Sequence, residues 1–271
     1  MPVVKHEAFF RRHPVFTGDE LAAYLTSRGE VGARGQEALL AYYTKTRRVV
    51  RVRRGLYAVV PRGANPNAYP IDPYLVAAKL TQDAVLSHHT ALEFHGRAYS
   101  VWHHLIYSAS RPVGSLTFRS QVFRGAKFPK ALLRSGTEHF GVLNSERSGV
   151  AMRVTSLERT LVDVLHRPDL SGGWEEIWRS LESVEFFDID QVVEYALLLD
   201  NATTSAKVGF FFEQHREALM VEEHHLRPLR DRCPQQPHYL DRTRPQPGCL
   251  APDWNLIVPR DILEQSWGEV L

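Results

Sequence analysis

The sequence predicts an α+β protein in which an N-terminal winged helix-turn-helix domain precedes a larger mixed α/β domain. The first reason is charge, because residues 1–62 hold 12 Lys and Arg against 5 Asp and Glu. That is a net +7 in a chain whose total is +2, so the remaining residues carry −5. The second reason is a proline-rich stretch at the point where the charge changes sign. The third is the series of helix and strand patterns on both sides of it.

Two helices are expected at the start of the chain. Residues 4–12 predict a short one. Thr17 and Glu20 have the spacing of a capping box, in which each side chain accepts a hydrogen bond from the other residue's backbone N–H. A second helix therefore begins here, and Gly29 is a typical end for it.

A third helix and a hairpin complete the N-terminal domain. Residues 33–46 predict the helix. Its expected apolar face comprises Leu39, Tyr42, Tyr43 and Thr46. Residues 48–53 alternate valine with arginine, which predicts a strand with one apolar and one basic face. A turn at Arg54 and Gly55 then leads into a returning strand over residues 56–60.

The domain boundary is predicted from composition. Residues 61–73 contain four prolines, one glycine and little that could be buried, which is typical of a linker. We therefore assign residues 1–62 to the winged helix-turn-helix domain, residues 63–73 to the linker and residues 74–271 to the α/β domain.

The second domain shows alternating helix and strand patterns. Ser87 is a candidate N-cap, and Thr155 with Glu158 has the spacing of another capping box. One expected helix begins at this capping box. The others cover residues 72–80, 88–95, 174–183, 189–199 and 209–219. The expected strands cover residues 105–108 and 116–123. Residues 228–252 hold six prolines and are expected to form a long surface loop.

The basic helix and hairpin predict contact with double-stranded DNA. The major groove admits an α-helix, and Arg and Gln can each make two hydrogen bonds to one base edge. A basic hairpin would neutralise backbone phosphates. The expected base contacts are Arg34, Gln36 and Lys45, and the expected backbone contacts are Arg47, Arg48, Arg51, Arg53 and Arg54. The alternative is a solvated basic face on a structural module.

Evidence for catalysis is weak in this sequence. The histidine-rich segment has no HExxH motif and no neighbouring cysteine, and half-buried packing is the better interpretation of His88, His89, His95, His103 and His104. Cys233, His238 and Cys249 match no common zinc spacing. The carboxylates Glu158, Asp163 and Glu185 are scattered, and Gly-rich phosphate loops are absent. We therefore expect a non-enzymatic protein with no catalytic residue, metal or cofactor.

Two other functions stay open. One is a metal-dependent nuclease or hydrolase that the N-terminal domain targets to DNA, and the other is a non-catalytic protein-interaction module. The sequence has no apolar run long enough to span a membrane and no visible signal peptide, and its two cysteines do not make a disulfide framework. A cytoplasmic location without membrane contact is expected.

Four phrases in the chain resemble the AbiEi antitoxins, which are transcriptional regulators of type IV toxin–antitoxin systems that act in abortive infection, an antiviral defence. They are RVRRGLYAV at 51–59, DPYLVAA at 72–78, LSHHTALEFHG at 86–96 and VTSLERTLVD at 154–163. Their order and spacing carry the resemblance, which covers about residues 1–220. Residues 228–271 match nothing in the family pattern.

The resemblance implies a transcriptional autorepressor and antitoxin. The N-terminal domain would bind inverted repeats upstream of its own operon. The C-terminal domain would counter a nucleotidyltransferase-like toxin encoded next to it, without needing to bind that toxin directly. The implied DNA contacts fall on the eight residues named above. The segment Ser87-His88-His89 matches a recurrent family motif to which we assign no role.

Overall fold

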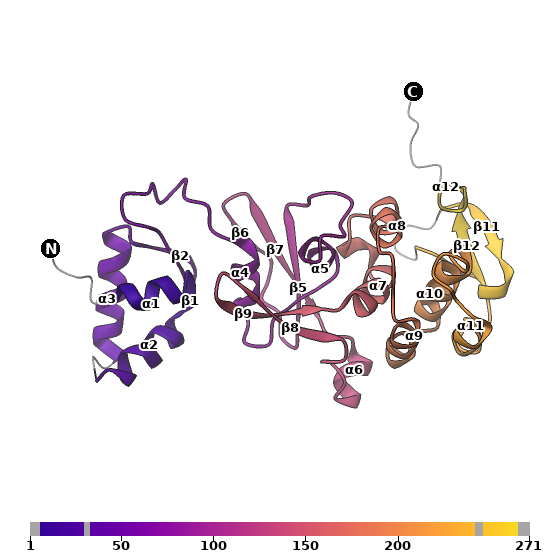
Figure 1. The fold of residues 1–271 in the computed structure, drawn as a ribbon, viewed down its shortest axis with the longest axis horizontal. Helices are drawn as coiled ribbons and strands as arrows, with labels where there is room; N and C mark the ends of the chain where they lie inside the picture. Colours follow the sequence, from indigo (N-terminus) through magenta and orange to yellow (C-terminus); the bar gives the residue numbers. More distant parts are fainter. Residues whose placement is uncertain (1–5, 30–32, 242–245, 265–271) are drawn as a thin grey trace, which may run out of the picture.

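The protein is a mixed α+β structure with an elongated shape (Figure 1). The computed structural model describes residues 6–29, 33–241 and 246–264. Three parts follow one another along the long axis, which we call the head (residues 6–60), the sheet region (residues 73–155) and the helical region (residues 156–264). No helix in the described ranges is long and apolar enough to cross a membrane.

The head combines helices with a small antiparallel sheet. Its elements are α1 (Glu7–Arg12), β1 (Val15–Thr17), α2 (Gly18–Ser27), α3 (Ala33–Lys45), β2 (Val49–Arg53) and β3 (Leu56–Val59). The strands lie in the order β1-β3-β2. Side chains from the helices and one face of the sheet form the core of the head, with Phe9, Phe16 and Leu21 almost fully buried. The sequence predicted the helices and the hairpin but missed β1.

Local signals place α2 and α3, with one correction. The capping box is confirmed, because Glu20 N donates to Thr17 Oγ1 at 3.2 Å and Thr17 N donates to Glu20 Oε2 at 2.8 Å. The predicted apolar face of α3 is wrong at Tyr42, whose side chain is 59% exposed. The buried stripe runs through Leu40 and Tyr43 at helical spacing, and Tyr42 lies beyond its edge.

The second face of the head sheet packs against the sheet region. Val52 and Leu56 are buried in one cluster with Leu75 and Val76 of the next helix. Successive residues of a strand point to opposite faces, so Val49 faces the core of the head while Val52 faces the rest of the molecule. The hairpin is therefore covered on both faces along part of its length.

The predicted linker is attached to the sheet region. Arg119 donates hydrogen bonds to the carbonyl oxygens of Tyr69 and Pro66, the second at 2.7 Å. Arg147 pairs with Asp72 at 2.5 Å. Two arginines of the sheet region therefore fix the course of the segment between head and body.

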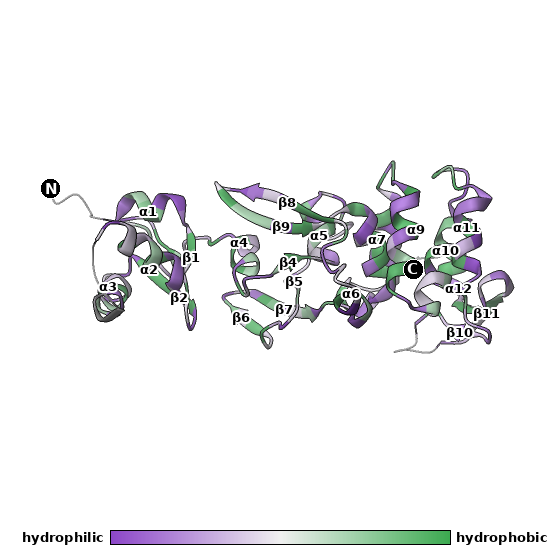
Figure 2. Ribbon diagram, turned by 90° about the horizontal axis from the view of Figure 1, so that it is seen from below, coloured by the Kyte–Doolittle hydropathy of each residue, from purple (hydrophilic) through white to green (hydrophobic). Residues whose placement is uncertain are grey.

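A six-stranded mixed sheet forms the centre of the molecule. Its strands are β4 (Val85–Leu86), β5 (His104–Ala109), β6 (Leu116–Phe118), β7 (Gln121–Lys127), β8 (Val142–Arg147) and β9 (Val150–Thr155), in the order β6-β7-β5-β4-β9-β8. The pairs β5–β7 and β4–β9 are parallel, and the others are antiparallel. Helix α4 (Pro73–Ala78) covers the side toward the head, and α5 (His89–Phe94) lies on the other side (Figure 2). Helix α6 (Lys130–Ser135) connects β7 to β8.

Three sequence predictions in this part are corrected. Residues 116–123 form two strands with a turn between them. The N-cap of α5 is His88 and not Ser87, whose hydroxyl turns inward. The N-cap of α7 (Leu157–His166) is Ser156, whose hydroxyl accepts from Arg159 N, so the capping box predicted for Thr155 and Glu158 is wrong.

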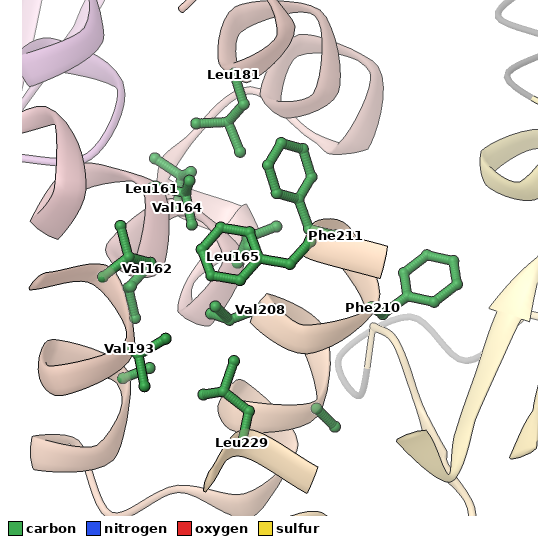
Figure 3. Close-up of a cluster of buried hydrophobic side chains, with 14 of the residues drawn as sticks. Leu161, Val162, Val164, Leu165, Leu181, Val193, Val208, Phe210, Phe211 and Leu229 are labelled. Atoms are coloured by element: carbon green, nitrogen blue, oxygen red, sulfur yellow. The ribbon is translucent and has the colours of Figure 1, made fainter. Parts of the chain in front are cut away.

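Five helices build the core of the helical region. They are α7, α8 (Trp174–Glu182), α9 (Ile189–Leu198), α10 (Ala202–Gln214) and α11 (Glu223–Arg230), with a 3-10 turn at Pro168–Leu170. Their apolar faces converge on one cluster, in which Leu165, Val208 and Phe211 lie close together (Figure 3). The predictions for α8 and α9 are confirmed within a residue, while α10 begins seven residues before the predicted start.

The predicted loop over residues 228–252 is partly wrong. Helix α11 contains Pro228. The strands β10 (His238–Tyr239) and β11 (Gly248–Ala251) pair with β12 (Leu256–Pro259), and α12 (Arg260–Leu263) follows. Trp254 anchors this sheet on α10, where its ring packs so closely over Gly209 that a Cβ atom there would lie within 2.5 Å of it.

Candidate functional site

An exposed basic surface lies at the end of α3 and on the adjoining strand. Lys45 ends α3, Arg47 follows it with φ of +56°, and Arg51 lies on β2. All three side chains are exposed. Lys45 and Arg51 line a shallow groove of about 490 Å³ together with Glu37, Thr44 and Tyr57. Among the described residues no carboxylate forms an ion pair with these three cations, so their charge faces solvent.

Two of the predicted DNA contacts are held inside the head. The guanidinium of Arg48 pairs with Glu7 at 2.5 Å, donates to the carbonyl oxygen of Val60 and lies over the Phe10 ring. The amide of Gln36 donates to the carbonyl oxygen of Gly18 at 2.5 Å, which fastens α3 to the start of α2. Arg48 and Gln36 therefore stabilise the head, and we leave both out of the DNA contacts proposed below.

The hairpin turn faces the sheet region. Arg53 and Arg54 line a crevice of about 820 Å³ between head and body, together with Lys79 and Arg153. Lys79 also forms an ion pair with Glu20 across this crevice. Burial alone would raise the pKa of Glu20, but hydrogen bonds from Lys79 and from the Thr17 backbone lower it. The two arginines thus lie beside the body and not with Lys45 and Arg51.

The outer face of α3 includes exposed residues for which the sequence predicted no DNA contact. Arg34 lies in the first turn of α3, but its side chain is outside the described part of the structure. Glu37, Ala38, Ala41 and Tyr42 are exposed along the same helix. The exposure of Tyr42 beside Ala38 and Ala41 could not be predicted from the sequence, because the sequence does not show which face of α3 is buried.

A buried polar network surrounds the turn between β4 and α5. His88 has φ of +53° and ψ of −135°, a strained conformation for a residue other than glycine. Its Nδ1 lies 2.9 Å from Ser87 Oγ, which in turn lies 2.9 Å from Ser108 Oγ. Burial lowers the pKa of His88 to about 4, so the ring is neutral near pH 7. Ser87 is fully buried, which leaves its hydroxyl unavailable as a nucleophile.

His89 lies between two carboxylates. Its Nε2 is 3.1 Å from Glu176 Oε1, and its Nδ1 is 3.6 Å from Glu93 Oε1, too far for a hydrogen bond. Glu176 also accepts hydrogen bonds from Tyr99 N, Ser100 N and Ser100 Oγ. Burial alone would raise the pKa of Glu176, but the hydrogen bonds from His89 and Ser100 lower it to about 2. Glu176 therefore fixes the loop before β5 as an ionised group.

A second buried network joins α7 to α9. Arg159 donates to Asp163 at 3.4 Å and to the carbonyl oxygens of Glu138 and Phe140 at 2.7 Å. Tyr195 OH donates to Asp163 Oδ1 at 2.7 Å. Burial and the Asp163 charge raise the pKa of Tyr195 well above its usual value. Asp163 thus has a structural role, and Glu158 and Glu185 do not join it.

The remaining histidines and the two cysteines were considered above as possible metal ligands, and each has its own surroundings in the fold. His95 contacts the carbonyl oxygen of Thr155, His104 stacks on Trp102, and His103 is exposed. Thr203 Oγ1 lies 2.7 Å from Nδ1 of His238. Within the described ranges, Cys233, His238 and Cys249 do not come together as possible metal ligands.

Asp190, His224 and His225 do bring ligand atoms within 4.8 Å of one another. However, His225 Nδ1 accepts a hydrogen bond from Glu222 N at 3.0 Å. A neutral imidazole that accepts at Nδ1 carries its proton on Nε2, the atom that lies 3.5 Å from Asp190. This arrangement favours a helix cap with a long polar contact to Asp190 over a metal site.

Comparison with known proteins adds a fold relationship. No protein-family profile and no curated protein sequence matches the chain. Among solved structures, the chain is similar to the crystal structure of the RV2827C protein from Mycobacterium tuberculosis, with a TM-score of 0.61 and 16% sequence identity. The similarity covers 96% of this chain and 93% of that chain. At this identity the comparison establishes a shared fold over nearly the whole length.

Proposed function

We propose that the head is a winged helix-turn-helix domain that binds double-stranded DNA. The order helix, strand, two helices and hairpin, with the sheet order β1-β3-β2, supports this assignment. In such a domain α3 enters the major groove and α2 crosses behind it. Helix α3 lies at the end of the molecule that points away from the sheet region, so the body does not obstruct its approach to DNA (Figure 1).

The observation that carries the proposal is the exposed cation set of Lys45, Arg47 and Arg51. These cations are exposed and form no ion pair among the described residues, so their charge stays available for phosphates, and each phosphate contact releases counterions. The exposed stripe of α3, with Tyr42 and the small residues Ala38 and Ala41, leaves room for close contact with base edges. Arg34 in the first turn keeps its proposed base-reading role.

We further propose that the chain is a transcriptional autorepressor and antitoxin of a type IV system, acting without catalysis. This part rests on the resemblance of the four sequence phrases to AbiEi antitoxins. The head would bind inverted repeats upstream of its own operon, in the cytoplasm. The body would counter a nucleotidyltransferase-like toxin, with direct contact not required.

DNA binding is tested by fluorescence anisotropy on the upstream DNA over a range of salt concentrations. We expect the triple variant Lys45→Ala/Arg47→Ala/Arg51→Ala to lower the salt slope by about 2 to 3, since each lost phosphate contact contributes about 0.9. Arg134→Ala removes an exposed arginine on α6 in the body and is the matched control. Wild-type protein that fails to bind the upstream DNA at low salt, or a triple variant with unchanged slope, would refute the proposal.

The antitoxin role needs a separate test. We expect co-expression with the neighbouring gene product to restore growth, and the triple variant to retain this rescue while losing repression of a reporter. Toxicity that persists with wild-type protein would exclude the antitoxin role without touching the DNA-binding proposal.

A further inference from the structure

A pocket of about 410 Å³ opens on the body between α4, α5 and the sheet. Its walls include Tyr74 of α4, Glu93 of α5 and Trp102 of the loop before β5. Leu105 of β5 and Gln121 of β7 also line it. The volume lies within the range of about 300 to 1,000 Å³ that is usual for small-molecule sites, and the site lies far from α3.

Glu93 gives this pocket a negative charge. Its carboxylate accepts hydrogen bonds from Trp102 N at 2.8 Å and from Tyr74 OH at 3.3 Å, both neutral donors. No lysine or arginine pairs with Glu93 in the described ranges. Arg147 stacks on the Tyr74 ring at 4.6 Å, but its charge is paired with Asp72. His89 is the remaining neighbour, and its Nδ1 lies 3.6 Å from Glu93 Oε1, too far for a hydrogen bond. The carboxylate, which is only 10% exposed, therefore has no lysine or arginine partner among the described residues.

The other polar groups of the pocket also favour a ligand that donates hydrogen bonds. Gln121 Oε1 is buried without a hydrogen-bond partner, which adds a second acceptor to the lining. Burial and the Glu93 charge raise the pKa of Tyr74 to about 12, so its phenol stays neutral and donates to Glu93. The pocket thus combines a carboxylate, an unpaired acceptor and aromatic walls. Acceptors select ligands with N–H donors, and aromatic faces attract cations.

We propose that the pocket lined by Tyr74, Glu93 and Trp102 binds a small planar organic cation of the amidinium or guanidinium type. The two N–H groups of such a ligand match the carboxylate of Glu93 in bidentate geometry. Its flat body matches the indole of Trp102. Because this site is independent of the head, the proposal does not depend on DNA binding.

Calorimetric titration of the full-length protein with benzamidine tests the proposal, with benzamide as the neutral analogue of the same shape. We expect benzamidine, which is a cation at pH 7, to bind at least ~10-fold more tightly than benzamide. Glu93→Gln keeps the size and one acceptor and should remove that preference. Glu146→Gln, an exposed acid on the far edge strand β8, should bind as the wild type does.

A gain-of-binding variant keeps the test independent of folding defects. Val101 is 89% exposed at the rim of the pocket, so Val101→Glu adds negative charge without burying it, and benzamidine binding should tighten. Equal binding of benzamidine and benzamide would overturn the proposal. A Glu93→Gln variant that still prefers benzamidine would also overturn it. So would wild-type protein that shows no binding at about 10 mM benzamidine, a concentration that would saturate a specific site.

Discussion

The head and the helical region use arginine in opposite ways. In the head, Arg47 and Arg51 are exposed and form no ion pair among the described residues. In the helical region, Arg159 is 1% exposed, pairs with Asp163 and lies over the Tyr195 ring at 5.0 Å. The same side chain is therefore a surface charge in one region and a fixed part of the core in the other.

Net charge also changes along the chain beyond the head. Residues 63–167 hold 12 Lys and Arg against 7 Asp and Glu, whereas residues 168–271 hold 9 against 19. The −5 assigned to the body therefore combines +5 beside the head with −10 in most of the helical region. The basic character does not end at the linker, and the acidic part lies at the opposite end from α3 (Figure 1).

The largest effect is expected where the buried network of the helical region is broken. Asp163→Ala leaves the Arg159 guanidinium and the Tyr195 hydroxyl without their carboxylate. We expect the free energy of unfolding to fall by about 3 to 5 kcal/mol, because an unpaired charge then stays buried. Urea denaturation measures this. Glu194→Ala, an exposed position on α9, should change it by less than about 0.5 kcal/mol.

A loss below about 1 kcal/mol for Asp163→Ala would contradict this interpretation, because that is the level expected of an exposed pair. It would mean that the carbonyl oxygens and the aromatic rings hold Arg159 without the carboxylate. The contrast between the two regions would then be one of exposure only.

The next effect concerns pH. His88 has a folded pKa of about 4 against an ordinary value of 6.5, because it is buried and neutral. The unfolded chain takes up a proton below pH 6.5 while the folded chain does not, so stability is full above that pH. It is lost as the pH falls from about 6.5 to 4, by up to about 3 kcal/mol from this residue.

His88→Asn tests this assignment because asparagine keeps an acceptor near Ser87 and has no titration. We expect the slope of unfolding free energy against pH between 4 and 6.5 to fall by about 1.4 kcal/mol per pH unit, the value for one proton. Burial also lowers the pKa of His166, so part of the slope remains. His103→Asn, at an exposed position, should leave it unchanged; an unchanged slope in His88→Asn would show that other groups cause the acid sensitivity.

Sequence patterns were sufficient where structure depends on near neighbours. The box at Thr17 and Glu20 and the helices α8 and α9 follow from capping and periodicity within a few residues. Other predictions failed where a partner is distant in sequence. Strand β4 has two residues, and it exists because β5 and β9 pair with it on either side.

The same reasoning explains the outcome at the candidate interface. Arg48 and Arg51 are three residues apart in one basic run, so a prediction based on charge treats them alike. Their difference arises from Glu7 and the carbonyl oxygen of Val60, which the fold brings to Arg48 only. Gln36 resembles Arg48 in this respect, because its hydrogen-bond partner Gly18 belongs to another helix.

The smallest expected effect separates these two arginines directly. Arg48→Ala removes the partner of Glu7 and should lower the free energy of unfolding by about 1 to 2 kcal/mol. Arg51→Ala should change stability by less than about 0.5 kcal/mol, because its side chain is exposed. On DNA the order reverses, since only Arg51→Ala removes a phosphate contact and lowers the salt slope by about 0.9. If Arg48→Ala instead left stability intact and lowered the slope, Arg48 would belong to the DNA surface, and the proposed division of the basic run would be wrong.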